Sequence, residues 1–180
     1  NNNADNRLIT GSGTANTLNG ESTLTYDGVN FKVGTGVTIA TTSGVATFRS
    51  GRIDVGDSLQ NTSIGQGAGD AHTTGNSNVA VGYDALTNNT TGVHNVAVGK
   101  GALDTNSTGG YNTAVGSVAM DANTSGLHNS AIGYAALTAN TTGRDNSAVG
   151  MSVMIANTTG SYNVALGSYT LDANTTGSYN

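Results

Sequence analysis

Residues 112–126 read NTAVGSVAMDANTSG, and residues 163–177 read NVALGSYTLDANTTG. Both open with the phrase N-x-A-[VIL]-G. This phrase recurs every 17 residues from residue 61 onward, with no insertion or deletion and with Ser63 in place of its alanine once. A fixed period indicates a solenoid, in which each coil contacts only its neighbours. Because 17 residues are few for a helical repeat, the sequence predicts an all-β fold: a parallel β-roll, or β-solenoid, of seven 17-residue coils.

Glycine and asparagine mark the turns of the repeat. Glycine occupies positions 5 and 15 of all seven units, which implies two turns per unit. Asparagine recurs at position 12 in six units, and at position 1 throughout. Stacked coils would align these side chains into ladders that hydrogen-bond from coil to coil. The expected position-1 ladder consists of Asn61, Asn78, Asn95, Asn112, Asn129, Asn146, Asn163 and Asn180.

Two apolar positions are expected to fill the coil interior. Position 4 is aliphatic in every unit, and position 9 is Leu or Met in every unit but the first, where Gly69 stands. The predicted structural core is Ile64, Val81, Val98, Val115, Ile132, Val149 and Leu166 at position 4, with Leu86, Leu103, Met120, Leu137, Met154 and Leu171 at position 9.

Position 3 carries only small side chains. Successive residues of a strand point to opposite faces, so positions 3 and 4 lie on opposite sides. If position 4 points inward, position 3 points outward, where a row of alanines would let another backbone approach closely. The sequence therefore predicts a subunit interface along Ala80, Ala97, Ala114, Ala131, Ala148 and Ala165.

The first 60 residues lack the period, so the chain is divided into a β-rich neck or shaft, 1–60, and a solenoid, 61–180, expected to continue beyond residue 180. In the neck, STLTY and VNFKV flank Asp27-Gly28, which predicts a hairpin with its turn at residues 26–29. Short strands are also expected at Val37 to Ala40 and Val45 to Arg49.

Composition limits the classes of protein to which the chain can belong. Only 36% of residues are hydrophobic and only 9% are charged, which argues against both a large apolar core and a charge-rich disordered chain. The net charge of −5 gives no basic surface for nucleic acid, and no apolar run approaches the length of a membrane span. There is no cysteine. Stability is therefore expected from stacking and oligomerisation.

No catalytic constellation is visible. The eleven acidic residues and three histidines are scattered. Asp70, Asp104, Asp121 and Asp172 share position 10, where a solvated turn is favoured over a carboxylate pair. Position 17 holds Ser77, His94, Tyr111, His128, Asp145, Tyr162 and Tyr179; there surface or interface packing is favoured over metal binding, because His94 and His128 would lie about 10 Å apart along one chain. We expect no enzymatic activity, no cofactor and no metal.

The units quoted above resemble the left-handed parallel β-roll repeats of YadA-like heads in trimeric autotransporter adhesins, and equally repeats in phage tail fibres. The resemblance covers residues 61–180 and implies a homotrimer. The coil here is longer than in the adhesin head, around the NTTG turn. Residues 8–33, LITGSGTANTLNGESTLTYDGVNFKV, are similar to segments of virion fibre proteins, which favours the fibre.

The expected function is therefore that of a structural and adhesive segment of a phage tail fibre, or a similar virion appendage, that supports attachment to a host surface. Its partners would be two further copies of the chain, other appendage proteins, and a host-surface glycan or protein, with no membrane insertion. The alternative is the head of a bacterial trimeric autotransporter adhesin at the cell surface. A minor alternative is an ice-binding solenoid, because rows of threonine on a flat β-face can order water.

Overall fold

A computed structural model describes residues 25–26, 31–32 and 59–180 of the protein. The chain separates into two units, Asn1–Arg52 and Ile53–Asn180. Each unit is treated by itself. Within the described residues no helix is long and apolar enough to cross a membrane.

In the first unit, strands β1 (Thr25–Tyr26) and β2 (Phe31–Lys32) pair in antiparallel fashion. Tyr26 lies opposite Phe31, and Thr25 lies opposite Lys32, so Asp27 and Gly28 fall in the connection between the strands. The hairpin pairing expected from the sequence is present. Three other expectations concern the neck. The turn and the strands expected at residues 37–40 and 45–49 lie outside the described residues. The domain boundary expected near residue 60 lies at their limit.

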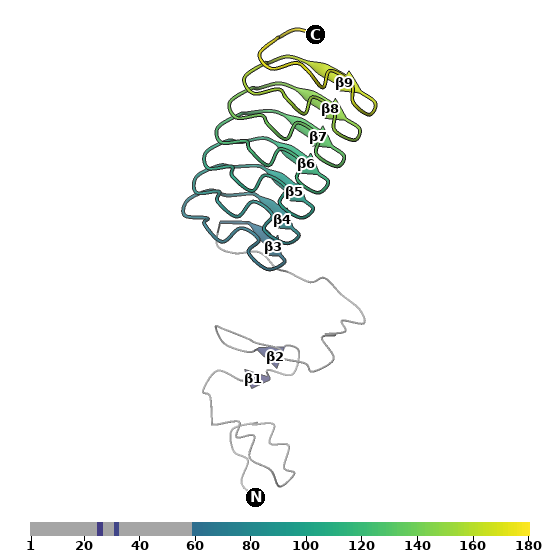
Figure 1. Ribbon diagram of the computed structural model, residues 1–180. Helices are drawn as coiled ribbons and strands as arrows, with labels where there is room; N and C mark the ends of the chain where they lie inside the picture. Colours follow the sequence, from purple (N-terminus) through teal and green to yellow (C-terminus); the bar gives the residue numbers. More distant parts are fainter. Residues whose placement is uncertain (1–24, 27–30, 33–58) are drawn as a thin grey trace, which may run out of the picture. The chain divides into compact units, whose positions relative to one another are not determined.

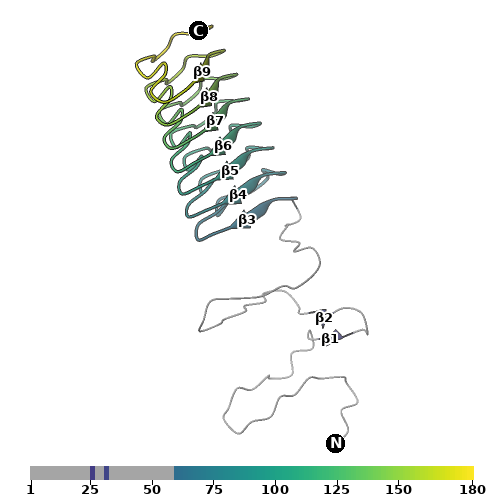
Figure 2. The ribbon, with the colours of Figure 1, turned by 90° about the vertical axis from the view of Figure 1, so that its right-hand side faces the viewer.

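The second unit is a β-solenoid of about six turns. It contains one parallel sheet of seven strands in sequential order, and each residue of strands β3 to β8 pairs with the residue 17 positions further along the chain. Figures 1 and 2 show the coils stacked in register along one axis. The strands are β3 (Thr62–Ile64), β4 (Val79–Val81), β5 (Val96–Val98), β6 (Thr113–Val115), β7 (Ser130–Ile132), β8 (Ser147–Val149) and β9 (Val164–Leu166).

Because the register is constant, side chains at one position of successive units form a row along the solenoid axis, which we call a column and number by its position in the unit. The three residues of each strand occupy columns 2, 3 and 4. The all-β solenoid with a 17-residue coil is thus confirmed, and the remaining question is which columns face inward.

The coil interior is filled by columns 3, 8 and 9. The column-9 side chains of Leu86, Leu103, Met120, Leu137 and Met154 are fully buried, as predicted, and Leu171 packs partly buried against the same cluster. The alanines of column 3, from Ala80 to Ala148, are also 0% exposed, and Ala165 is 3% exposed. Column 8, which the sequence analysis did not single out, adds five buried alanines, Ala68, Ala85, Ala102, Ala119 and Ala136, and the fully buried Val153.

The prediction for column 4 is therefore wrong, and so is the placing of the alanine row on the outer surface. Val115 is 36% exposed and Ile132 is 43% exposed, whereas Ala114 and Ala131, their neighbours in the strands, are completely buried. The same holds along the column: Ile64, Val149 and Leu166 are exposed, and Val81 and Val98 are half-buried. A 17-residue coil is narrow, and one Leu or Met together with two alanines already fills it. A larger side chain in column 3 has no space.

The buried asparagines form two hydrogen-bonded ladders. In the column-1 ladder, each side-chain oxygen accepts a hydrogen bond from the backbone N–H of the next asparagine, at 3.0 Å from Asn129 to Asn112. Each side-chain Nδ2 donates to the glycine carbonyl at position 15 of its own coil, at 2.8 Å from Asn112 to Gly126. In column 12 the bond between coils joins two side chains: Asn123 Nδ2 donates to Asn106 Oδ1 at 2.7 Å, and also to Gly126 O at 3.3 Å.

The ladders satisfy polar groups that would otherwise be buried without partners. Asn112 and Asn123 are both 0% exposed, and both donate to the same carbonyl. An unpaired buried polar group costs about 1–3 kcal/mol. Each coil presents the same amide and carbonyl groups to the next coil. Asparagine at positions 1 and 12 therefore provides hydrogen-bond partners for these groups along the whole stack, as the ladder prediction requires.

The glycines of columns 5 and 15 are needed because the coils approach closely there. Gly82 has φ +138°, and a Cβ on it would lie 2.6 Å from the carbonyl oxygen of Gly99 in the next coil. A Cβ on Gly109 would lie 2.5 Å from the carbonyl oxygen of Gly126. Backbone therefore occupies the space that a side chain would need.

Candidate functional site

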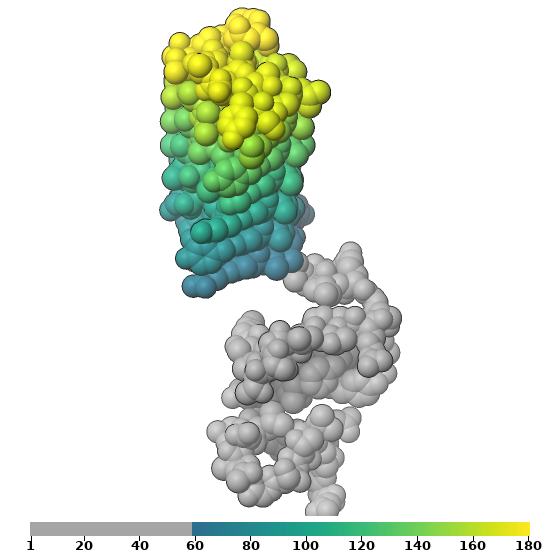
Figure 3. Space-filling model, turned by 45° about the vertical axis from the view of Figure 1, so that its right-hand side comes forward, coloured from purple at the N-terminus to yellow at the C-terminus, as the bar shows by residue number. Residues whose placement is uncertain are grey.

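The strands present an apolar outer face formed by columns 2 and 4. Column 4 is entirely aliphatic, and column 2 holds Val79, Val96 and Val164 together with threonine and serine. Residues two apart in a strand point to the same side, so the two columns share one face. Figure 3 shows the coils as successive bands on the solenoid's surface. The constant register aligns columns 2 and 4 from each coil to the next. Seven strands at about 4.8 Å per step make it about 29 Å long.

Column 6, two residues beyond the end of each strand, also exposes large side chains in several coils. Tyr83 is 50% exposed, Tyr134 is 59% exposed and Met151 is 42% exposed. Lys100 follows Tyr83 in the column, before Tyr134 and Met151, and its Nζ lies 5.9 Å from the centre of the Tyr83 ring. The aliphatic row of column 4 is the contiguous part of this surface, and contiguous exposed apolar surface is typical of protein interaction sites.

A second candidate surface is column 17, where aromatic and polar side chains stack from coil to coil. Tyr111 lies between two histidines, with ring centres 4.9 Å from His94 and 5.1 Å from His128. Further along, the rings of Tyr162 and Tyr179 stack at 4.9 Å with 7° between their planes. The two histidines are thus separated by a tyrosine and cannot share an ion within one chain.

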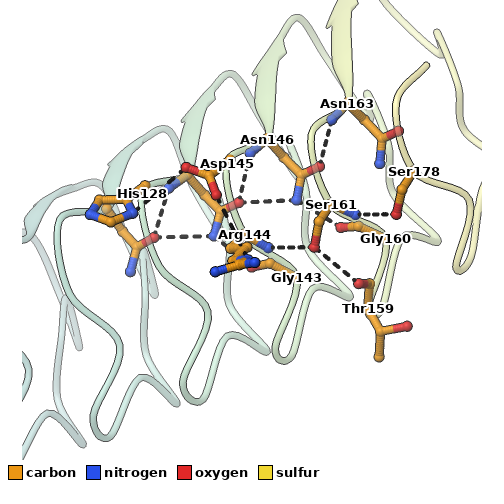
Figure 4. A network of polar contacts seen from close by, with 12 residues as sticks. His128, Gly143, Arg144, Asp145, Asn146, Thr159, Gly160, Ser161, Asn163 and Ser178 are labelled. Carbon is orange, nitrogen blue, oxygen red and sulfur yellow. Dashed lines mark hydrogen bonds and ion pairs between the residues drawn. The ribbon is translucent and has the colours of Figure 1, made fainter.

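Charged side chains connect the two parts of column 17 (Figure 4). Asp145 Oδ1 lies 3.6 Å from His128 Nδ1, and Asp145 Oδ2 lies 3.9 Å from Arg144 Nε. The Arg144 guanidinium lies over the Tyr162 ring, 5.5 Å from its centre. These contacts join column 17 from His94 to Tyr179 into one row on the surface, in which Arg144 of column 16 links Asp145 to Tyr162; we call the row, with Arg144, the column-17 ladder.

The backbone under the column-17 ladder is left-handed. All seven residues of the column have φ between 56° and 60°. Glycine, asparagine and aspartate adopt this conformation most readily, and a bulky residue costs on the order of 1 kcal/mol or more. Ser77 and Asp145 fit the same backbone as His94 or Tyr111, so the coil itself does not require a ring at this position.

Columns 13 and 14, which consist of threonine and serine, differ in whether their hydroxyl groups hydrogen-bond to the neighbouring coil. In column 13, each hydroxyl donates to the carbonyl of the next coil, at 3.1 Å from Thr124 to Thr141 and from Thr141 to Thr158. Column 14, which includes Thr108 and Thr142, is exposed.

The six asparagines of column 12 are each followed by two serine or threonine residues, a sequence that matches the acceptor pattern for N-glycosylation. They are hydrogen-bonded in the interior or between the coils, so the folded solenoid does not present Asn123 or its equivalents as glycosylation acceptors.

The aspartates of column 10 are less solvated than the sequence suggests. Asp104 and Asp121 are half-buried. Burial, together with the charge of Asp84, raises the pKa of Asp104 above its usual 3.8. Burial, together with the charge of Asp104, likewise raises the pKa of Asp121 above 3.8. The ionised carboxylates therefore destabilise the folded coil.

The Asp121→Asn variant is expected to have a slightly higher free energy of unfolding than the wild type at pH 7. The pKa of Asp121 is higher in the folded than in the unfolded state, so stability falls as the pH rises from 3.8 through the folded pKa. Below pH 3.8 the carboxyl is protonated in both states, and the difference should vanish. Urea unfolding at pH 3 and pH 7, with the exposed Asp172→Asn variant as control, checks this; an equal difference at both pH values would contradict it.

Among residues 59–180, no three His, Asp or Glu side chains lie close enough together to hold a metal ion. The residues predicted as core, ladder and interface thus lie in structural columns, and the chemically varied side chains gather in columns 6 and 17.

These features define a repeat protein of the β-solenoid class. No protein-family model, curated protein or solved structure matches the chain.

Two features escaped the sequence analysis: the outward direction of column 4, and the continuous contacts of column 17. A signal for the first was present, because alanine at position 3 is nearly invariant while position 4 varies among Val, Ile and Leu. An interior site of fixed volume tolerates less change in size than an exposed one. The second follows from the 17-residue register, which places His94, Tyr111 and His128 in adjacent coils.

Proposed function

We propose that the chain is a segment of a homotrimeric attachment fibre, namely a phage tail fibre or similar virion appendage. In this fibre the solenoid serves as a stiff structural and adhesive element. The observation that carries the proposal is the exposed face of columns 2 and 4, in which column 4 is aliphatic in every coil. The fibre context and the threefold stoichiometry come from the repeat resemblance described above.

The apolar face has the properties expected of a contact between copies. Aliphatic side chains such as Val115 and Ile132 are exposed in the single chain, and no element of residues 59–180 covers them. In a trimer each copy meets two neighbours, and both can pack against an extended face that lies at the threefold axis. A parallel arrangement would also keep equivalent coils level, so that each layer of the assembly repeats the same contacts.

The Val115→Asp variant is expected to dissociate the assembly while leaving the coils folded. One aspartate per chain would place three carboxylates in one layer of the apolar face, and an unpaired buried charge costs several kcal/mol. Mass photometry should report trimers for the wild type and monomers for the variant. Circular dichroism of the variant should retain the β signal.

The matched control is the adjacent Ala114→Leu. Ala114 is completely enclosed within its own coil, so leucine would overpack the interior and lower the free energy of unfolding by about 1–3 kcal/mol per chain. The two variants thus separate association from folding. A wild-type protein that is a stable monomer would overturn the proposed function, and a trimeric Val115→Asp variant would show that the copies meet elsewhere.

The head of a bacterial trimeric autotransporter adhesin remains the second candidate, because its repeats resemble these coils equally well. Both candidates predict a trimer. Negative-stain imaging of the intact source separates them, since one predicts a fibre on a particle and the other predicts a projection on a cell surface. Ice binding has less support: the column-13 hydroxyls donate to backbone carbonyls, and a measurement of thermal hysteresis tests it directly.

A further inference from the structure

We propose that the column-17 ladder is a binding surface for a linear polysaccharide lying along the solenoid axis. This inference rests on the proposed function, because it names the ligand class that an attachment fibre of this kind would contact. It concerns a different set of side chains from the apolar face, which is assigned to contacts between copies.

The first reason is that the ladder side chains are not required by the fold. The backbone of column 17 is left-handed in every coil, and its N–H donates to the preceding coil whatever the side chain is, at 2.9 Å for Tyr111 and 3.0 Å for Asp145. Ser77 serves equally well there. Nevertheless five of the seven positions carry tyrosine or histidine, although serine and aspartate fit the same backbone.

The second reason is the chemistry that the ladder exposes. The ring faces pack against one another, so it is the ring edges that meet the solvent, and these carry hydroxyl and imidazole groups. Tyr111 is 54% exposed, and His94, His128 and Arg144 are also exposed. Such a row offers hydrogen-bond donors and acceptors at every coil. A ligand rich in hydroxyl groups along its whole length matches it.

The third reason is the period. Successive ladder side chains are separated by one coil, about 4.8 Å, and they are held at that spacing by stacking and by the Arg144 and Asp145 contacts. A small molecule would contact one or two coils at most. A polymer extended along the axis would meet a polar or aromatic side chain at each coil from His94 to Tyr179.

Charge selects the kind of polymer. Residues 59–180 contain two basic side chains, Lys100 and Arg144, and six aspartates, so a nucleic acid would be repelled. Five of those aspartates lie in columns 7 and 10, away from the ladder: Asp70, Asp84, Asp104, Asp121 and Asp172. The ladder itself combines Arg144 and two histidines with the single carboxylate of Asp145. It can therefore accept a neutral or weakly anionic glycan.

Each coil contributes little affinity, so binding should depend on the length of the glycan. Linked weak contacts add through effective concentration. Affinity is expected to rise steeply with oligosaccharide length until the chain spans His94 to Tyr179, five coil steps or about 24 Å, and to change little beyond that length.

The test uses the full chain on an array of immobilised bacterial O-antigen and capsular polysaccharides. Size-graded fragments of the best binder are then titrated by calorimetry. The Tyr111→Asn/His128→Asn double variant removes two rings but keeps a residue that accepts the left-handed backbone. The control is Thr108→Asn/Thr142→Asn, which alters two exposed residues of column 14. We expect at least a tenfold loss of affinity for the first pair and less than a twofold change for the second.

Several results would overturn the inference: no wild-type binding to any polysaccharide on the array, equal binding by the ladder variant, or affinity independent of fragment length. Attachment to whole cells that survives periodate but not proteinase would point to a protein receptor and would also overturn it. Mass photometry of the same samples keeps the two proposals apart. A trimer that binds no glycan refutes only the ladder, whereas a monomer refutes the fibre.

Discussion

Replacing Gly116 with valine is expected to disrupt the stack at the centre of the solenoid. Gly116 has φ +139°, and a Cβ there would lie 2.6 Å from the carbonyl carbon of Gly133 and closer still to its oxygen. The obstacle is backbone, which cannot move without separating β6 from β7. We expect a loss of more than about 4 kcal/mol in the free energy of unfolding, because a backbone clash and a strained φ act together.

Chemical denaturation followed by circular dichroism measures the loss, and Ser117→Val is the matched control. Residue 117 belongs to column 6, where Tyr83, Lys100 and Met151 show that large side chains are accepted. The control should unfold within about 0.5 kcal/mol of the wild type, as surface substitutions usually do. If Gly116→Val and Ser117→Val unfold alike, the close approach of coils at column 5 is assigned wrongly.

The Asn112→Ala variant is expected to lower the free energy of unfolding by about 2–4 kcal/mol, because it removes buried hydrogen bonds and leaves a cavity. Alanine cannot accept the backbone N–H of Asn129, now 3.0 Å from the Asn112 oxygen, nor donate to Gly126. Gly126 retains the amide of Asn123, but the Asn129 N–H loses its partner inside the solenoid.

Asn88→Ala provides the comparison for this ladder variant. Asn88 is exposed, and its side chain donates to the backbone carbonyl and the carboxylate of Asp104 at the surface, at 3.0 Å and 3.2 Å. Because exposed groups exchange such bonds for water, the change should cost less than about 1 kcal/mol. Thermal melts of the two variants should differ by roughly 10 °C. Equal melting temperatures would mean that the column-1 ladder does not stabilise the fold.

Much of the architecture follows from the repeat alone. A 17-residue period with no insertion fixes the register of every coil, and the strands β3 to β9 pair as that register requires. The asparagine ladders were predictable for the same reason, since a buried amide at one position of every coil has the same amide as its neighbour. The interior place of Leu103 and Met120 also follows, because these are large apolar side chains just after a turn.

The direction of columns 3 and 4 was not decided by the sequence. Alternation along a strand puts Ala114 and Val115 on opposite sides, but it does not say which side is the interior. Hydrophobicity favours the valine, because an aliphatic side chain tends to leave water. A valine side chain can leave water inside its own coil or against another chain. Both cases favour an aliphatic residue, so the residue type does not distinguish them.

The sequence by itself determined the period, the number of coils, the two asparagine ladders and the column-9 core, because these depend only on which residues recur at a fixed spacing. The tertiary structure alone decided that the alanines lie inside, that the aliphatic column faces outward, and that column 17 forms one continuous ladder. Those features depend on the width of the coil. Columns 8 and 9 reach the interior from the opposite side and leave room only for alanine, so Val115 and its equivalents must face outward.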